Sequence, residues 1–206
     1  NAIAKHREND PYWKPFFDGY PPVRAWLDRV KPDVAVVFYQ DHGLNFFLDK
    51  MPTFAVGAAP EYRNSDEGWG IPTVKPVKGD PALSWHIIES LVADEFDITM
   101  CQEMKVDHAL TSPKRSYRLG ESVGRAIASW KEDVRVLVMG TGGLSHQLDG
   151  QRAGFINKPF DLMCMDALVD DPKKLTRYSA LDLVREAGAQ GTELMAWMAA
   201  RAALPG

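Results

Sequence analysis

The sequence predicts an α/β protein with a single domain, in which helices cover both faces of a mainly parallel or mixed central sheet. Short apolar runs rich in β-branched residues alternate along the chain with stretches whose apolar residues recur at helical spacing. This alternation is typical of parallel strands joined by helices. A length of 206 residues, with 45% hydrophobic and 25% charged residues, is typical of one globular domain. We therefore expect residues 1–206 to form one domain.

The first half of the chain predicts two strands and one helix. The run DVAVVFY at 33–39 is rich in β-branched and aromatic residues, which favours a strand buried on both faces. TFAVGA at 53–58 is a second candidate strand. The Pro- and Gly-rich stretch at 67–81 predicts a long irregular connection, and such connections often carry binding residues. An Asp-Pro pair then fits the N-cap and first turn of a helix at 81–94.

The second half predicts two more strands and a helical C-terminal part. FDITMCQEM at 96–104 is the third strand, and VRVLVMG at 134–140 is the fourth. Between them, an apolar stripe predicts a helix at 119–131. Three later stretches show helical periodicity, at 161–170, 180–188 and 192–204.

Composition and charge argue against several classes of function. A net charge of −4 and a pI of about 5.7 leave no basic face for nucleic acid. The apolar runs are too short to span a membrane and the N-terminus lacks the features of a signal peptide, so we expect a cytoplasmic protein. Cys101 and Cys164 are too few for a disulfide framework or a zinc knuckle, and we expect both to be buried apolar side chains.

Three of the five histidines come a few residues after the ends of predicted strands. His42 follows the first strand, His108 the third, and His146 the fourth. Because ligands of open parallel sheets bind beyond the carboxyl ends of the strands, this placement predicts a metal site, a proton-transfer site, or both. His86, inside a predicted helix, and His6, in a charged N-terminal stretch, are expected to be structural or solvated.

His146 lies in the glycine-rich stretch GTGGLSHQ, which fits neither of two known glycine motifs. A dinucleotide-binding motif needs glycine where Ser145 stands, and a nucleophile elbow needs glycine at Gln147. What remains is a turn whose lack of side chains lets another group approach the backbone beside His146. Glu193 is a candidate carboxylate partner, because two imidazoles and one carboxylate leave open positions on an iron. Stabilisation of the helix dipole is the alternative role for Glu193.

Five segments together resemble the class III extradiol ring-cleavage dioxygenase family, and within it the protocatechuate 4,5-dioxygenase β-subunit type. The segments are YQDHG, PTFAVGAAPEYRNSDEGWG, ADEFDITMCQEMKVDHALTSP, GTGGLSHQLDGQRAGFINKPFD and GTELMAW. They occur in the same order as in the family and cover nearly the whole chain. The stretch GTGGLSHQ followed by GQRAG is the most specific of them.

The resemblance implies extradiol cleavage of a dihydroxybenzoate by O₂ at a non-haem Fe(II), as in the catabolism of lignin-derived aromatics. Protocatechuate 4,5-cleavage is the first expectation, and gallate or 3-O-methylgallate cleavage is the alternative. Position by position, His42 and Glu193 match two iron ligands, and His108 matches an active-site histidine near substrate and oxygen. His146 matches the acid/base residue, which would take a proton from the second substrate hydroxyl and return it during ring opening.

The chain departs from the family in three places. The family's third iron ligand is a histidine in an N-terminal strand that precedes this sequence, and His6 does not align with it. Between 113 and 114 the family carries a further segment, and after ALPG it carries another that helps to bind the substrate carboxylate. We expect these segments to belong to the protein but to lie outside this sequence.

Two other functions and several partners remain open from the sequence. The same histidines and Glu193 fit a metal-dependent hydrolase with zinc, and a truncated fold fits a non-catalytic binding module. The resemblance implies a small α subunit in an α₂β₂-type assembly, or a homo-oligomer. Arg152 in GQRAG could bind a substrate carboxylate, but a structural arginine is the preferred interpretation.

Overall fold

The computed structural model describes residues 7–40, 46, 52–63, 75–102 and 112–205. Its helices in this part of the chain are α1 (Lys14–Asp18), α2 (Tyr20–Val30), α3 (Pro81–Ala93), α4 (Pro113–Ala128), α5 (Lys158–Asp170), α6 (Ala180–Ala187) and α7 (Leu194–Ala203). Its strands are β1 (Val34–Phe38), β2 (Ala55–Gly57), β3 (Glu61–Tyr62), β4 (Val77–Lys78), β5 (Thr99–Cys101) and β6 (Val136–Gly140). Short 3₁₀ helices are η1 (Gly150–Arg152), η2 (Pro172–Arg177) and η3 (Gln190–Glu193).

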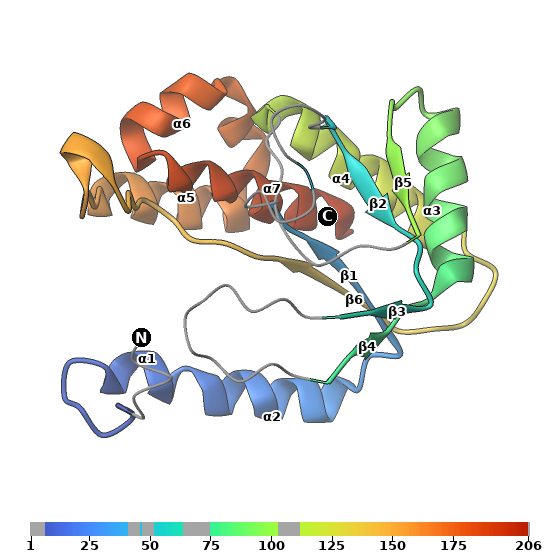
Figure 1. The fold of residues 1–206 in the computed structure, drawn as a ribbon, viewed down its shortest axis with the longest axis horizontal. Helices are drawn as coiled ribbons and strands as arrows, with labels where there is room; N and C mark the ends of the chain where they lie inside the picture. Colours follow the sequence, from blue (N-terminus) through green and yellow to red (C-terminus); the bar gives the residue numbers. More distant parts are fainter. Residues whose placement is uncertain (1–6, 41–45, 47–51, 64–74, 103–111, 206) are drawn as a thin grey trace.

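The described strands pair in twos, and the α/β class is confirmed (Figure 1). β1 runs parallel to β6, with Val34 opposite Val136 and Phe38 opposite Gly140. β2 runs parallel to β5, and β3 and β4 form a short antiparallel ribbon. Because β1 and β6 are parallel and in this register, their carboxyl ends lie side by side. The segments that follow these two strands therefore begin close together.

The helices bury two hydrophobic clusters. The first lies between α3 and α4, and three residues of β1 pack against it: Val34, Val36 and Phe38. The second joins α5, α6 and α7 around buried residues such as Leu175 and Met198. Each fully buried leucine or methionine contributes roughly 1.5–3 kcal/mol through removal of its side chain from water. α7 also packs against β1 and β6, so it connects the C-terminal helices to the strand pair.

A cavity of about 700 Å³ lies between the two parallel strand pairs. β1 and β2 line it from two sides, and apolar residues of α3, α4 and α7 complete its wall. It includes Gln40 and Met195, which are close to the predicted site residues in sequence, but neither His146 nor Glu193. The cavity is therefore a neighbour of the candidate site among the described residues, not the site itself.

Local signals correctly predicted the start of α3 but not that of α4. Asp80 caps α3, because its carboxylate accepts a hydrogen bond from the backbone N–H of Leu83 at 3.0 Å. α4 begins at Pro113, six residues before the predicted start, because Ser112 caps it and the proline fits the first turn. The intervening residues are mostly polar, so the apolar stripe alone could not reveal this first part. Within the described residues, no helix is long and apolar enough to cross a membrane.

Cys164, His86 and Arg152 all have structural surroundings, as predicted. Cys164 is buried, and burial together with the nearby charge of Asp161 raises the pKa of its thiol to about 12. The expectation of burial is wrong for Cys101, which is only partly buried at the end of the short strand β5. His86 is structural, since its Nε2 lies 2.9 Å from the Ala126 carbonyl oxygen and its ring contacts a tryptophan. Arg152 is structural too, because its guanidinium donates to two carbonyls of α6.

We expect a Gly120→Ala substitution to destabilise the protein, although Gly→Ala inside a helix ordinarily stabilises by about 0.5–1 kcal/mol. α4 and α7 cross closely at this glycine, and an added Cβ would overlap the backbone carbonyl of Ala199. Separating the helices should cost about 1–3 kcal/mol, measured as a lower urea midpoint at unchanged m-value. Gly19→Ala is the control, because Gly19 has right-handed helical dihedrals and more space. Equal stability of Gly120→Ala and the parent would contradict the close crossing.

Candidate active site

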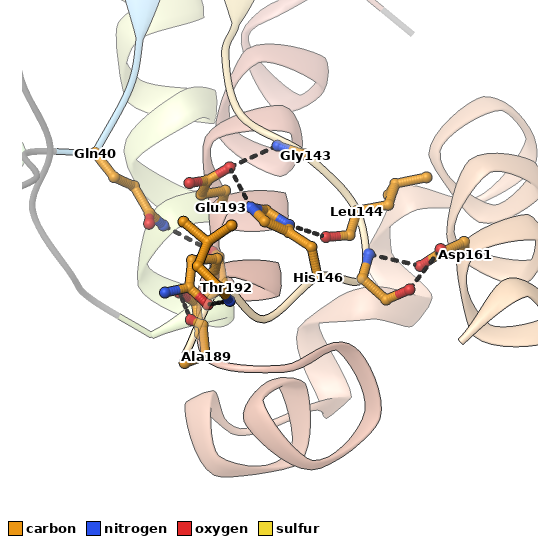
Figure 2. A network of polar contacts seen from close by, with 11 residues as sticks. Gln40, Gly143, Leu144, His146, Asp161, Ala189, Thr192 and Glu193 are labelled. Carbon is orange, nitrogen blue, oxygen red and sulfur yellow. Dashed lines mark hydrogen bonds and ion pairs between the residues drawn. The ribbon is translucent and has the colours of Figure 1, made fainter. Parts of the chain in front are cut away.

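The structure brings together His146 and Glu193, two residues that the sequence singled out (Figure 2). His146 follows β6, and Glu193 is the last residue of η3, immediately before α7. The Nε2 atom of His146 lies 3.9 Å from Oε2 of Glu193. The first residue after β6 is held to the end of β1, because the N–H of Thr141 donates to the Phe38 carbonyl at 2.9 Å. The imidazole and the carboxylate therefore lie beyond the carboxyl end of the strand pair, as expected.

The glycines of the turn make room for Glu193. The backbone N–H of Gly143 donates to Oε2 of Glu193 at 2.6 Å. Gly142 has a φ of +110°, and a Cβ at that position would lie 2.5 Å from Cβ of Glu193. A side chain at Gly142 would thus be strained and would also push the carboxylate away. Glu193 is only 7% exposed, and the backbone N–H of Gly143 provides a hydrogen-bond partner for one oxygen of this buried carboxylate.

The hydrogen bonds of His146 define which ring nitrogen carries the proton. Its Nδ1 lies 2.8 Å from the Leu144 carbonyl oxygen, which can only accept, so Nδ1 is the donor. In the neutral ring Nε2 then has a free lone pair, and this is the nitrogen on the Glu193 side. The backbone N–H of His146 donates to the Ala187 carbonyl at 2.8 Å. The imidazole is held at both its backbone and its ring, with Nε2 in the form that can accept a proton.

Gln40 ties the end of β1 to the segment that carries Glu193. Its Nε2 donates to the carbonyl of Thr192 at 2.7 Å, and the side chain is 8% exposed. Thr192 directly precedes Glu193, so the amide helps to hold the carboxylate near the strand ends. Gln40 was not among the residues predicted for the site. The available signal was its position immediately after a predicted strand and two residues before His42.

Asp161 and Ser145 form a second contact that the sequence did not reveal. Oδ1 of Asp161 accepts from the N–H of Ser145 at 2.8 Å, and Oδ2 accepts from its hydroxyl at 2.6 Å. The same hydroxyl accepts from the backbone N–H of Asn157 at 2.6 Å, just before α5. Ser145 itself is 5% exposed. Its partly buried hydrogen bonds to Asp161 (Figure 2) and Asn157 anchor the glycine-rich turn to the start of α5.

The other predicted histidines, His6, His42 and His108, lie outside the described residues. Among the residues that the structure does describe, no three His, Cys, Asp or Glu side chains form a cluster that could hold a metal ion. Carboxylates are among the ligands that Fe(II) accepts, and the Glu193 carboxylate is buried within this part of the chain. The arrangement therefore combines Glu193, a candidate metal ligand, with the imidazole of His146, whose Nε2 can accept a proton.

Comparison with known proteins identifies the family of this chain. The family model described as catalytic LigB subunit of aromatic ring-opening dioxygenase matches residues 2–113 and 109–206. A gallate dioxygenase of Pseudomonas putida is 34% identical over 170 aligned residues, which cover 68% of this chain and 50% of the relative.

More distant relatives carry another name. A 2,3-dihydroxyphenylpropionate/2,3-dihydroxicinnamic acid 1,2-dioxygenase of Cupriavidus necator is 33% identical over 64% of this chain and 53% of its own length. An enzyme of the same name from Azotobacter vinelandii is 31% identical over a region that covers 60% of this chain and 47% of its own length. The chain thus spans about half the length of the curated relatives it matches. It belongs to the family of catalytic LigB subunits of aromatic ring-opening dioxygenases.

Proposed function

We propose that the protein is an Fe(II)-dependent extradiol dioxygenase that opens the ring of a dihydroxybenzoate with O₂, with protocatechuate 4,5-cleavage as the first candidate reaction. The observation that carries this proposal is the pair formed by His146 and Glu193. An imidazole whose Nδ1–H is bound to a carbonyl offers Nε2 as a base, 3.9 Å from a buried carboxylate. This combination suits a reaction in which a diol loses a proton beside a metal.

We propose Glu193 and His42 as two of the iron ligands. The Glu193 carboxylate is buried and oriented by Gly143, as ligating carboxylates commonly are. His42 follows Gln40 by two residues, and Gln40 is hydrogen-bonded to the carbonyl that precedes Glu193. The third ligand would be the N-terminal histidine that the family resemblance places before this sequence. When bound between these residues, Fe(II) would supply Lewis-acid and redox chemistry, and the Lewis acidity would make the diol easier to deprotonate.

His146 would move the proton in this reaction. Its Nε2 would accept the proton of the second substrate hydroxyl and return it during ring opening. The bond from Nδ1 to Leu144 prevents the ring from presenting a donor in place of the lone pair. His108 is proposed as a further residue near substrate and oxygen, on the resemblance alone.

We further propose that the segment which the family carries between 113 and 114 belongs to the protein but lies outside this sequence. In support, the family model matches this chain in two parts that meet at residues 109–113. A separate small α subunit, or self-association, is proposed from the resemblance to the protocatechuate type. Co-purification of the full-length protein with a second, smaller chain would support the first of these assemblies.

A second candidate substrate is gallate, because the relative that is 34% identical is named gallate dioxygenase. The test is oxygen uptake by the full-length, Fe(II)-loaded protein, with protocatechuate, gallate, 3-O-methylgallate and 2,3-dihydroxyphenylpropionate compared side by side. We expect the highest kcat/KM with protocatechuate. A higher kcat/KM with gallate would make gallate the substrate and exclude protocatechuate as the first candidate. Consumption of the aromatic substrate that persists when Zn²⁺ replaces Fe(II) and O₂ is excluded would instead indicate a hydrolase and overturn the proposal.

A further inference from the structure

Among the described residues, Asp161 reaches the candidate active site through its hydrogen bonds to Ser145. One of these bonds is to the peptide group whose carbonyl contacts the His146 ring. The carboxylate accepts from both the N–H and the hydroxyl of Ser145. The N–H of Ser145 and the carbonyl of Leu144 belong to one planar peptide group and point in opposite directions. The N–H side faces Asp161, and the carbonyl side faces Nδ1 of His146. Fixing one side of this group therefore fixes the other.

We propose that Asp161 is a positioning residue for His146. By holding the peptide between Leu144 and Ser145, it keeps the Leu144 carbonyl against Nδ1 of the imidazole. This contact keeps the proton of the neutral ring on Nδ1 and the lone pair on Nε2, toward Glu193. The inference rests on the proposed function for its catalytic consequence, but the position of the ring proton can be measured without substrate or iron.

A purely structural role of Asp161 is the competing explanation. Asp161 lies in the first turn of α5, where any carboxylate favours the helix dipole. The chain offers a matched comparison in α6, where Asp182 accepts from the N–H and the hydroxyl of Ser179 in the same way. That pair is exposed and local to its helix. Loss of Asp182 should therefore lower stability without changing the ring of His146.

The experiment measures the ring tautomer of His146 by ¹⁵N NMR in histidine-labelled full chain at a pH where the ring is neutral. The His146→Gln spectrum identifies the signals. We expect Nδ1–H in the parent, in Asp161→Asn and in Asp182→Ala, because the asparagine carbonyl can still accept from the Ser145 N–H. Asp161→Ala should shift the ring to a mixture of Nδ1–H and Nε2–H. With full-length, Fe(II)-loaded protein, Asp161→Ala should also lower kcat by about tenfold at nearly unchanged KM, with recovery in Asp161→Asn.

Two results would overturn the inference. One is an Nε2–H tautomer in the parent protein, which needs no variant and so does not depend on Asp161→Ala folding. The other is an unchanged Nδ1–H tautomer in folded Asp161→Ala. Failure of the proposed function is a separate result, namely absence of oxygen uptake by the parent with every substrate tested. The tautomer measurement decides the role of Asp161 in either case.

Discussion

Replacing His146 by alanine is expected to lower kcat by about 10²–10⁴-fold, the usual contribution of a general acid–base residue. The ring is held with Nε2 as the free nitrogen, and the substitution removes this base from beside Glu193. Bound iron should remain close to one per chain, because His146 is not among the proposed ligands. The measurements are steady-state oxygen uptake and iron content of the same Fe(II)-loaded full-length preparation.

His86→Gln is the matched control for this substitution. His86 lies within α3, with Nε2 bound to the Ala126 carbonyl and its ring against a tryptophan. Its loss should reduce stability but leave kcat unchanged. Near-full turnover by His146→Ala would refute the acid/base assignment. Loss of iron together with turnover would instead make His146 a metal ligand.

The elements with strong local patterns were predictable from the sequence. β1 and β6 fall inside the predicted strands at 33–39 and 134–140, because apolar β-branched runs favour buried strands. α2 was not predicted, since two prolines near its start suggest an irregular segment, although proline is tolerated in a first turn. The ribbon of β3 and β4 was also missed. Each strand has two residues and depends on a partner distant in sequence, so no local pattern marks it.

The candidate site was predictable only in part, for a related reason. His146 could be found from its position after a strand, and Glu193 from the resemblance together with its chemistry. Gln40 and Asp161 act through bonds to backbone groups of distant residues, 152 positions away for Gln40 and 16 for Asp161. A backbone carbonyl or N–H is present at nearly every residue, so such partners leave no sequence pattern.

The substitution with the largest expected effect on iron is Glu193→Gln. The glutamine carbonyl can still accept the hydrogen bond from Gly143, so the turn should keep its conformation. What is lost is the negative charge and the carboxylate oxygens that would bind Fe(II). Even residues that only orient a ligand change metal affinity by about 10–100-fold, so loss of the ligand itself should exceed about 100-fold. We expect the variant to retain almost no iron after desalting, with a urea midpoint close to that of the parent.

Glu132→Gln provides the control, because this glutamate is exposed in the segment before β6 and the substitution makes the same change of charge. It should bind iron like the parent. Retention of iron by Glu193→Gln would contradict the ligand assignment and leave Glu193 with a role in holding the Gly143 turn. The alternative role in the helix dipole makes a different prediction, because Glu193 directly precedes α7. Loss of a favourable charge at that end would lower stability by about 0.3–1 kcal/mol while iron binding stayed intact.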